Sequence, residues 1–227
     1  IHSNLHESLS GLRRQRLHRQ VATTLARMKP EAYEALAYHH FQAGDFELAR
    51  AYSLKAGERA LTTYANQEAE KHFRLALELN GPELEKAQAL SGLGRALYQQ
   101  DRFGEASEKW HEVIPLYRAL GDLDRLARTY AWLSDTERQR GNIVEAIRIG
   151  REGLAAVAGQ PVTVGLATLL RETSNACTMH DLKTEENASF LYRALSISEE
   201  LGDIPGQAEI LARLGFGVAF PPNSDPT

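Results

Sequence analysis

Histidine and carboxylate side chains are the first candidates for metal binding or proton transfer in this sequence. His2 and His6 stand four residues apart and could share a metal on one helix face, but two ligands alone do not define a metal site. His39 and His40 are adjacent, so we expect one at a helix crossing and the other facing outward. Carboxylates gather between positions 172 and 186, as is typical of a solvated helix face.

Sequence motifs with a known catalytic mechanism are not found. The chain contains no G-x-x-x-x-G-K-[ST], no H-E-x-x-H and no C-x-x-C. Gly92 and Gly94 lie inside a predicted helix, without the third glycine or the preceding strand that a phosphate-binding loop needs. Cys177 is the single cysteine, typical of a small buried residue. We therefore predict that the chain is not an enzyme and holds neither cofactor nor metal.

Composition and charge favour a helical protein. Of the 227 residues, 43% are apolar and 25% are charged, a balance typical of ordinary globular proteins. The formal charge of -4 is the reverse of a basic nucleic-acid-binding domain, so direct nucleic acid binding is not expected. One cysteine, no signal peptide and no long apolar run predict a cytoplasmic protein without a membrane segment.

The stretch 87–122 contains one complete unit of two amphipathic helices joined by a polar turn. Apolar residues recur there at helical spacing: Leu90, Leu93 and Leu97, then Ala106, Trp110 and Val113. Gly94 and Ala106 are small, so we expect them where the two backbones cross closely. A pair this short cannot bury its apolar faces alone, so it needs copies of itself on either side.

Copies of this unit can be found from the small residue near the start of each second helix. These residues are Ala49, Ala69, Ala106, Ala146 and Ala188, and aromatic residues follow four positions later at Phe73, Trp110 and Tyr192. The closing turn Leu120-Gly121-Asp122 returns as Leu201-Gly202-Asp203, two periods of about 40 residues later. The sequence therefore predicts a helical repeat protein.

The expected helices follow from this pattern and from the Gly, Asn and Pro residues that interrupt it. A first pair occupies 31–64, and its long second helix, which starts at Phe46, is shared with the next repeat. Asn66 is expected to cap a helix at 67–79. Further helices are expected at 124–140, 143–158, 162–179, 185–201 and 204 to about 220. The remaining residues, 221–227, have the composition of a disordered tail or linker.

The pattern resembles the tetratricopeptide repeat family, in which each first helix carries an aliphatic and then a small residue, and each second helix a small and then an aromatic one. The resemblance implies an all-α fold, a right-handed α-α superhelix of tetratricopeptide-like helical hairpins, with about five repeats in 29–220. In that family the first helices line a concave groove. The resemblance therefore implies a protein or peptide partner bound in this groove.

Outward positions on the predicted first helices are the candidate partner-binding residues. The selected site consists of Gln88, Arg95, Tyr98, Asp135, Arg138 and His180, and the middle four are expected to cluster. Other outward positions are Tyr38, Gln42, Ser91, Gln99, Arg128, Thr173, Cys177 and Phe216. Two alternatives stay open: that these side chains only solvate the groove, or that the groove holds a small polar effector.

Residues 1–28 do not follow the repeat. Their apolar stripe (Leu9, Leu12, Leu17, Val21 and Leu25) and four arginines (Arg13, Arg14, Arg16 and Arg19) are typical of a helix with a solvated face. Leu9, Ser10, Arg13, Arg14, Leu17 and His18 match the pattern L-S-x-x-R-R-x-x-L-H. This segment resembles the junction in large bacterial signalling ATPases, such as maltose-type transcriptional activators and regulators with cyclase or kinase output domains, where a winged-helix segment ends and a repeat domain begins.

The junction resemblance implies that 1–28 end a preceding domain and that the chain, which begins with Ile1, is a fragment of a signalling regulator. Self-association as a homodimer is a further alternative. It is favoured if the last helix, which lacks a partner helix, leaves an apolar face that a second copy covers.

Overall fold

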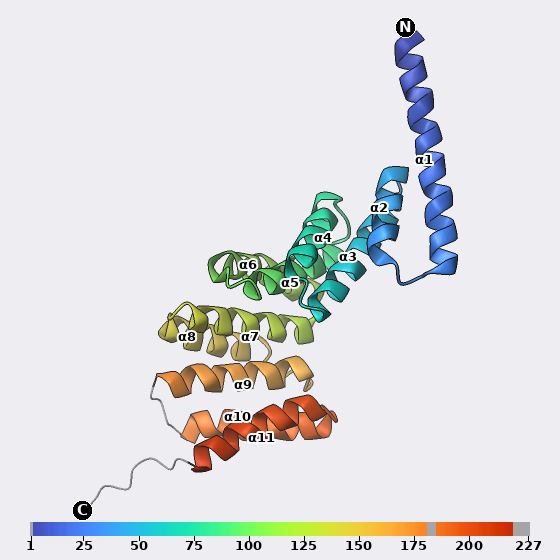
Figure 1. The fold of residues 1–227 in the computed structure, drawn as a ribbon. Helices are drawn as coiled ribbons and strands as arrows, with labels where there is room; N and C mark the ends of the chain where they lie inside the picture. Colours follow the sequence, from blue (N-terminus) through green and yellow to red (C-terminus); the bar gives the residue numbers. More distant parts are fainter. Residues whose placement is uncertain (1, 181–184, 220–227) are drawn as a thin grey trace, which may run out of the picture. The chain divides into compact units, whose positions relative to one another are not determined.

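The computed structural model describes residues 2–180 and 185–219, with side chains described for 11–180 and 185–215. In these ranges all regular structure is helical (Figure 1). The helices are α1 (His2–Met28), α2 (Tyr33–Ala43), α3 (Phe46–Thr62), α4 (Asn66–Glu78), α5 (Glu83–Tyr98), α6 (Phe103–Leu120), α7 (Leu123–Gln139), α8 (Ile143–Ala156), α9 (Val164–Met179), α10 (Glu185–Glu200) and α11 (Ile204–Ala219). The predicted 221–227 tail lies outside the described residues.

Contacts divide the chain into two compact units, residues 1–109 (unit 1) and 110–227 (unit 2). In unit 1, α1 packs on α2, α2 on α3, α3 on α4 and α4 on α5, while α3 also meets α5. In unit 2, α7 packs on α8 and α9, α9 on α8 and α10, and α11 on α9 and α10. Helix α3 packs on α2, α4 and α5, and its assignment to two successive repeats stays a prediction.

Six interhelical turns in the described chain share one backbone geometry. The residues with positive φ at these turns are Gly44, Tyr64, Asp101, Gly121, Gly141 and Gly202. The next N–H donates to the carbonyl five residues earlier, as in Asp122 to Tyr117 (3.1 Å) and Asp203 to Ser198 (2.8 Å). The two Leu-Gly-Asp segments are therefore the same turn, used twice.

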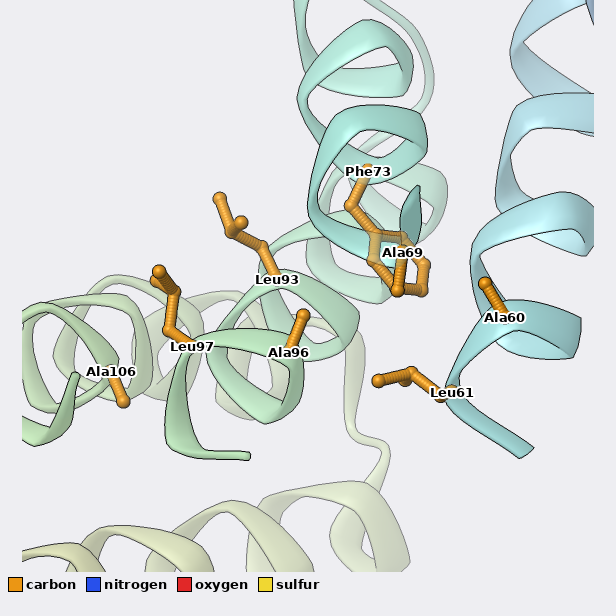
Figure 2. Close-up of a cluster of buried hydrophobic side chains, with 8 residues drawn as sticks. All are labelled: Ala60, Leu61, Ala69, Phe73, Leu93, Ala96, Leu97 and Ala106. Carbon is orange, nitrogen blue, oxygen red and sulfur yellow. The ribbon is translucent and has the colours of Figure 1, made fainter. Parts of the chain in front are cut away.

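The hairpin crossing of unit 1 is formed by glycine and an aromatic ring. A Cβ atom added to Gly57 of α3 or Gly92 of α5 would come within 2.7 Å or 2.2 Å of the Phe73 ring on α4. Figure 2 shows Phe73 and Ala69 among the leucines and alanines that α3 and α5 direct into the same cluster. Only a residue without a side chain allows the ring to lie so close to both backbones.

The crossings of unit 2 contain serine hydroxyl groups as well as glycine, since Gly153 of α8 lies against Tyr130 of α7. Ser134 Oγ of α7 donates to the carbonyl oxygen of Ala146 on α8 at 2.9 Å. Ser174 Oγ of α9 bonds the Asn187 side chain on α10. Trp110 is fully buried, stacks on Trp132 with ring centroids 5.9 Å apart, and donates from Nε1 to Thr136 Oγ1 at 3.1 Å.

Two local predictions were wrong. Ala188 is exposed, and the buried position near the start of α10 is Asn187. Asn187 lies 13 residues after its partner Ser174, whereas Ala146 lies 12 residues after Ser134. Tyr192, counted from Ala188, is accordingly 62% exposed. Asn66 does not cap α4. The N-cap residue is Ala65, and the Asn66 side chain instead donates to the carbonyl oxygen of Gln99 at 3.2 Å.

Candidate partner-binding surface

In unit 1 the three predicted site residues, Gln88, Arg95 and Tyr98, lie on α5 and are partly exposed. Arg95 Nη1 donates to Glu58 Oε2 of α3 at 3.1 Å. The Tyr98 ring meets the Phe103 ring edge-on, with centroids 5.3 Å apart. Helix α3 opens the hairpin that α4 closes, and α5 opens the next one, so this ion pair joins two successive first helices, although no groove residue was predicted on α3.

In unit 2 the predicted residues Asp135 and Arg138 lie on α7, and His180 follows the last residue of α9. Arg138 Nε donates to Asp135 Oδ1 at 2.9 Å, and Arg138 Nη1 lies 3.6 Å from the Met179 sulfur. His180 is exposed, and its backbone N–H closes α9 through bonds to Ala176 and Cys177. The Arg138–Met179 contact therefore places all three residues at the same end of the α7 and α9 pair.

The predicted clustering of Arg95, Tyr98, Asp135 and Arg138 involves residues of both units. Each pair is described within its own unit, and the combined cluster stays a prediction.

The sequence reasoning missed a charged network on α9 and α11. Arg171 of α9 donates to Glu172 at 3.0 Å and also pairs with Glu209 of α11. Arg213 of α11 lies 3.9 Å from Glu172. The Arg171 and Glu172 side chains are only 16% and 12% exposed, so their ion pairing is largely shielded from water. The period of about 40 could have located this face, because Asn175 follows Asp135 at that interval and bonds Glu172 at 2.7 Å.

Some of the outward positions were assigned to the wrong helix face. Thr173 and Cys177 are buried in unit 2, where the Thr173 hydroxyl donates to Leu169 and its side chain packs against Gly150. Tyr38 and Gln42 lie on α2, where Tyr38 is 54% exposed and Gln42 is partly exposed, as expected of outward positions. The Phe216 side chain lies outside the described residues.

Arg128 marks the opposite end of the α7 and α9 pair. Its Nε donates to Asp124 Oδ2 at 2.8 Å, and Asp124 Oδ1 accepts the Gly165 N–H at the start of α9 at 2.7 Å. Burial alone would raise the pKa of Asp124, but the bonds from Arg128 and Gly165 outweigh it and hold that pKa below its usual value. The charged Asp124 side chain therefore links α7 to the start of α9.

In the described part of the chain, Cys177, His39 and His40 pack against neighbouring helices and do not form a catalytic or metal-binding group. Burial raises the pKa of the Cys177 thiol, which disfavours the nucleophilic thiolate. His40 is buried and stacks on Tyr52, as expected of the histidine at a helix crossing. His39 does not face outward as expected, because it is partly buried and bonds His18 of α1. Among the described residues, no three His, Cys, Asp or Glu side chains are grouped to hold a metal ion. No described helix is both long and apolar enough to cross a membrane.

Comparisons with known proteins show the fold. No family model matches this chain, and no curated protein matches it in sequence. Among solved structures, BtubC (BKLC) from P. vanneervenii has a TM-score of 0.59 at 16% identity, covering 96% of this chain and 94% of that one. A putative kinesin light chain from Podosopora anserina, with nearly identical TPR-like repeats, has a TM-score of 0.57 at 12% identity and covers 84% and 97%. The chain has a tetratricopeptide-like fold.

A third similar structure supports the same assignment. The MamA protein has a TM-score of 0.56 at 16% identity, covering 84% of this chain and 94% of its own. Together with the helical hairpins, these structures confirm the predicted class, an all-α superhelix of tetratricopeptide-like hairpins. At these identities the similarity concerns the fold alone.

Proposed function

We propose that this chain is a non-catalytic interaction module that binds a partner protein through the exposed face of its first helices. The main support is that, within each unit, ion pairs join neighbouring first helices, Arg95 to Glu58 in unit 1 and Arg171 to Glu209 in unit 2. Side chains held in place by such pairs lose less conformational entropy when a partner binds. Arginine and tyrosine are also the residue types that most often dominate interface energies.

The proposed contact residues form two groups, Gln88, Arg95 and Tyr98 in unit 1 and Asp135, Arg138 and His180 in unit 2. Arg171 and Glu172 extend the second group. A partner segment of mixed charge fits this face, because both arginine and carboxylate side chains are present on it.

We also place this module in the cytoplasm, as the interaction or sensor segment of a bacterial signalling or transcriptional regulator. The resemblance of Leu9 to His18 to the junction of signalling ATPases supports this context.

The binding proposal is tested with matched arginine variants. A partner is first isolated and identified with the wild-type chain, and its affinity is then measured by calorimetry against each variant. Arg95→Ala and Arg138→Ala change first helices, while Arg74→Ala and Arg148→Ala change ion-paired arginines on second helices. We expect at least a tenfold loss of affinity for one or both of the first-helix variants and none for the controls. Equal affinities for all four would refute the surface.

Self-association is a second candidate, supported by exposed apolar residues at the end of unit 2. Leu201, Ile204 and Leu211 are 41%, 66% and 54% exposed. If a second copy covers them, sedimentation should show a dimer that Ile204→Glu converts to monomer. A wild-type chain that stays monomeric at high concentration would rule this candidate out.

A further inference from the structure

Helix α1 has one face that is used inside unit 1 and another that is not. On the used face, His18 bonds His39 through their Nδ1 atoms at 2.9 Å, Arg19 pairs with Asp45, and Ala22 is fully buried. These contacts dock α1 on α2 and on the turn that follows it. Figure 1 shows the N-terminal half of α1 extending beyond α2.

The unused face carries apolar side chains at the spacing of a helix–helix seam. Leu17, Val21 and Met28 are 54%, 45% and 71% exposed. Together with Thr24 they form a row in which successive residues are separated by four, three and four positions. An average spacing of about 3.5 residues aligns side chains for knobs-into-holes packing against one other helix. A membrane-surface helix presents a broader apolar face than this four-residue strip. The occupant that fits is therefore a helix.

The charges beside the seam indicate the chemistry of that helix. Arg13, Gln20 and Arg27 stand seven residues apart, in the row that flanks such a seam. No salt bridge joins Arg13 or Arg27 to a described side chain, and the same is true of Arg14, Arg16 and Arg193. In contrast, every arginine from Arg50 to Arg171 has a polar partner: Arg50, Arg59, Arg74, Arg95, Arg102, Arg118, Arg125, Arg128, Arg138, Arg140, Arg148, Arg151 and Arg171.

From the seam and these arginines we infer that the outer face of α1 docks one amphipathic helix of another polypeptide. That helix presents apolar residues to Leu17, Val21 and Met28, and Asp or Glu side chains to Arg13 and Arg27. A second copy of α1 does not supply the carboxylates, because its segment 8–28 contains no acidic residue. This surface uses different residues from the first-helix face, so the inference is tested independently of the proposed function.

The test uses designed peptides as probes of the full chain, with fluorescence anisotropy as the readout. One peptide is helical with leucine along its seam and glutamate beside it; a second has the same composition with the seam scrambled. The wild-type chain should bind the first peptide and not the second. Binding should weaken at least tenfold with Leu17→Ala/Val21→Ala and with Arg13→Glu/Arg27→Glu, and it should weaken as salt is raised.

Matched controls separate the seam from general effects. Leu12→Ala removes an apolar side chain from α1 that is 56% exposed but lies off the seam, and Arg193→Glu reverses an exposed charge on α10. Both should leave binding unchanged, and circular dichroism should show every variant folded. Equal binding of the scrambled peptide, or none of either, would overturn the inference. Binding to phosphatidylserine vesicles in place of the peptide would also overturn it, as would a dimer of the chain that Leu17→Ala/Val21→Ala dissolves.

Discussion

The two units build the same hairpin crossing with different chemistry. In unit 1 the Phe73 ring lies against the backbones of Gly57 and Gly92, without a polar group. In unit 2 Gly153 likewise lies against an aromatic residue, Tyr130, but Ser134 and Ser174 also bond the facing helix. Both solutions use small residues, because the helix backbones approach closely. The comparison shows that a crossing requires a small residue. A serine at that position can also donate a hydrogen bond that sets the relative position of the two helices.

The aromatic anchors should give the largest effect. Phe73 and Trp110 each stand four residues after a buried alanine and are fully buried, one in each unit. Trp110→Ala should lower the free energy of unfolding by about 3 to 5 kcal/mol, because it leaves a cavity beside Trp132. Tyr192→Ala is the control, since Tyr192 is 62% exposed and should change stability by less than about 0.5 kcal/mol. Urea denaturation measures both, and a Trp110→Ala effect below about 1 kcal/mol would contradict the packing.

Adding one methyl group at the crossing of unit 1 should give the second-largest loss of stability. Gly92→Ala should destabilise by about 1 to 3 kcal/mol, since the new Cβ would lie 2.2 Å from the Phe73 ring. Gly104→Ala meets no atom within 4 Å, so it should be neutral or stabilise its helix by up to about 1 kcal/mol. A Phe73→Leu background should reduce the Gly92→Ala effect. Equal thermal stability of the two alanine variants would show that the glycine is not required.

Removing a buried serine hydroxyl group should have a smaller effect, and one that differs between the two units. Ser134→Ala breaks the bond to Ala146 and should destabilise by about 1 kcal/mol. Ser53 of α3 is equally buried, but its hydroxyl has no hydrogen-bond partner among the described residues. Ser53→Ala should therefore be neutral or stabilising. The same loss at both positions, measured by chemical denaturation, would show that the hydroxyl bond does not distinguish the crossings.

The smallest expected effect concerns pH. Burial lowers the pKa of His72 in unit 1, and the nearby Glu34 and Glu68 only partly oppose this shift. Since the unfolded chain titrates near its usual value of about 6.5, it takes up the proton first, and stability falls as pH drops through that value. His72→Gln should flatten the decline between about pH 7.5 and 5.5 by less than about 1 kcal/mol. The exposed His111→Gln is the control, and identical pH profiles for wild type and His72→Gln would refute the role of His72.

Local patterns determined most of the secondary structure. The Leu-Gly-Asp turns were predictable because glycine readily adopts the positive φ seen at Gly121 and Gly202. Ala69, Ala106 and Ala146 were predicted as buried small residues because the helical period acts within one hairpin. The predicted ends of α7 to α11 agree with the structure within two residues for the same reason.

Contacts between distant segments decided the rest. Asn187, which bonds Ser174 across the hairpin, occupies the buried position that was predicted for Ala188. A long-range bond to Gln99 holds the Asn66 side chain, which was expected to cap α4. Gln88, Arg95, Tyr98, Asp135 and Arg138 were found on first helices by counting helical positions. The pairs Arg95–Glu58 and Arg171–Glu209 depend on how neighbouring first helices pack, which the periodicity of a single helix does not determine. Helical periodicity defines the faces of one helix, but only tertiary packing determines which faces meet.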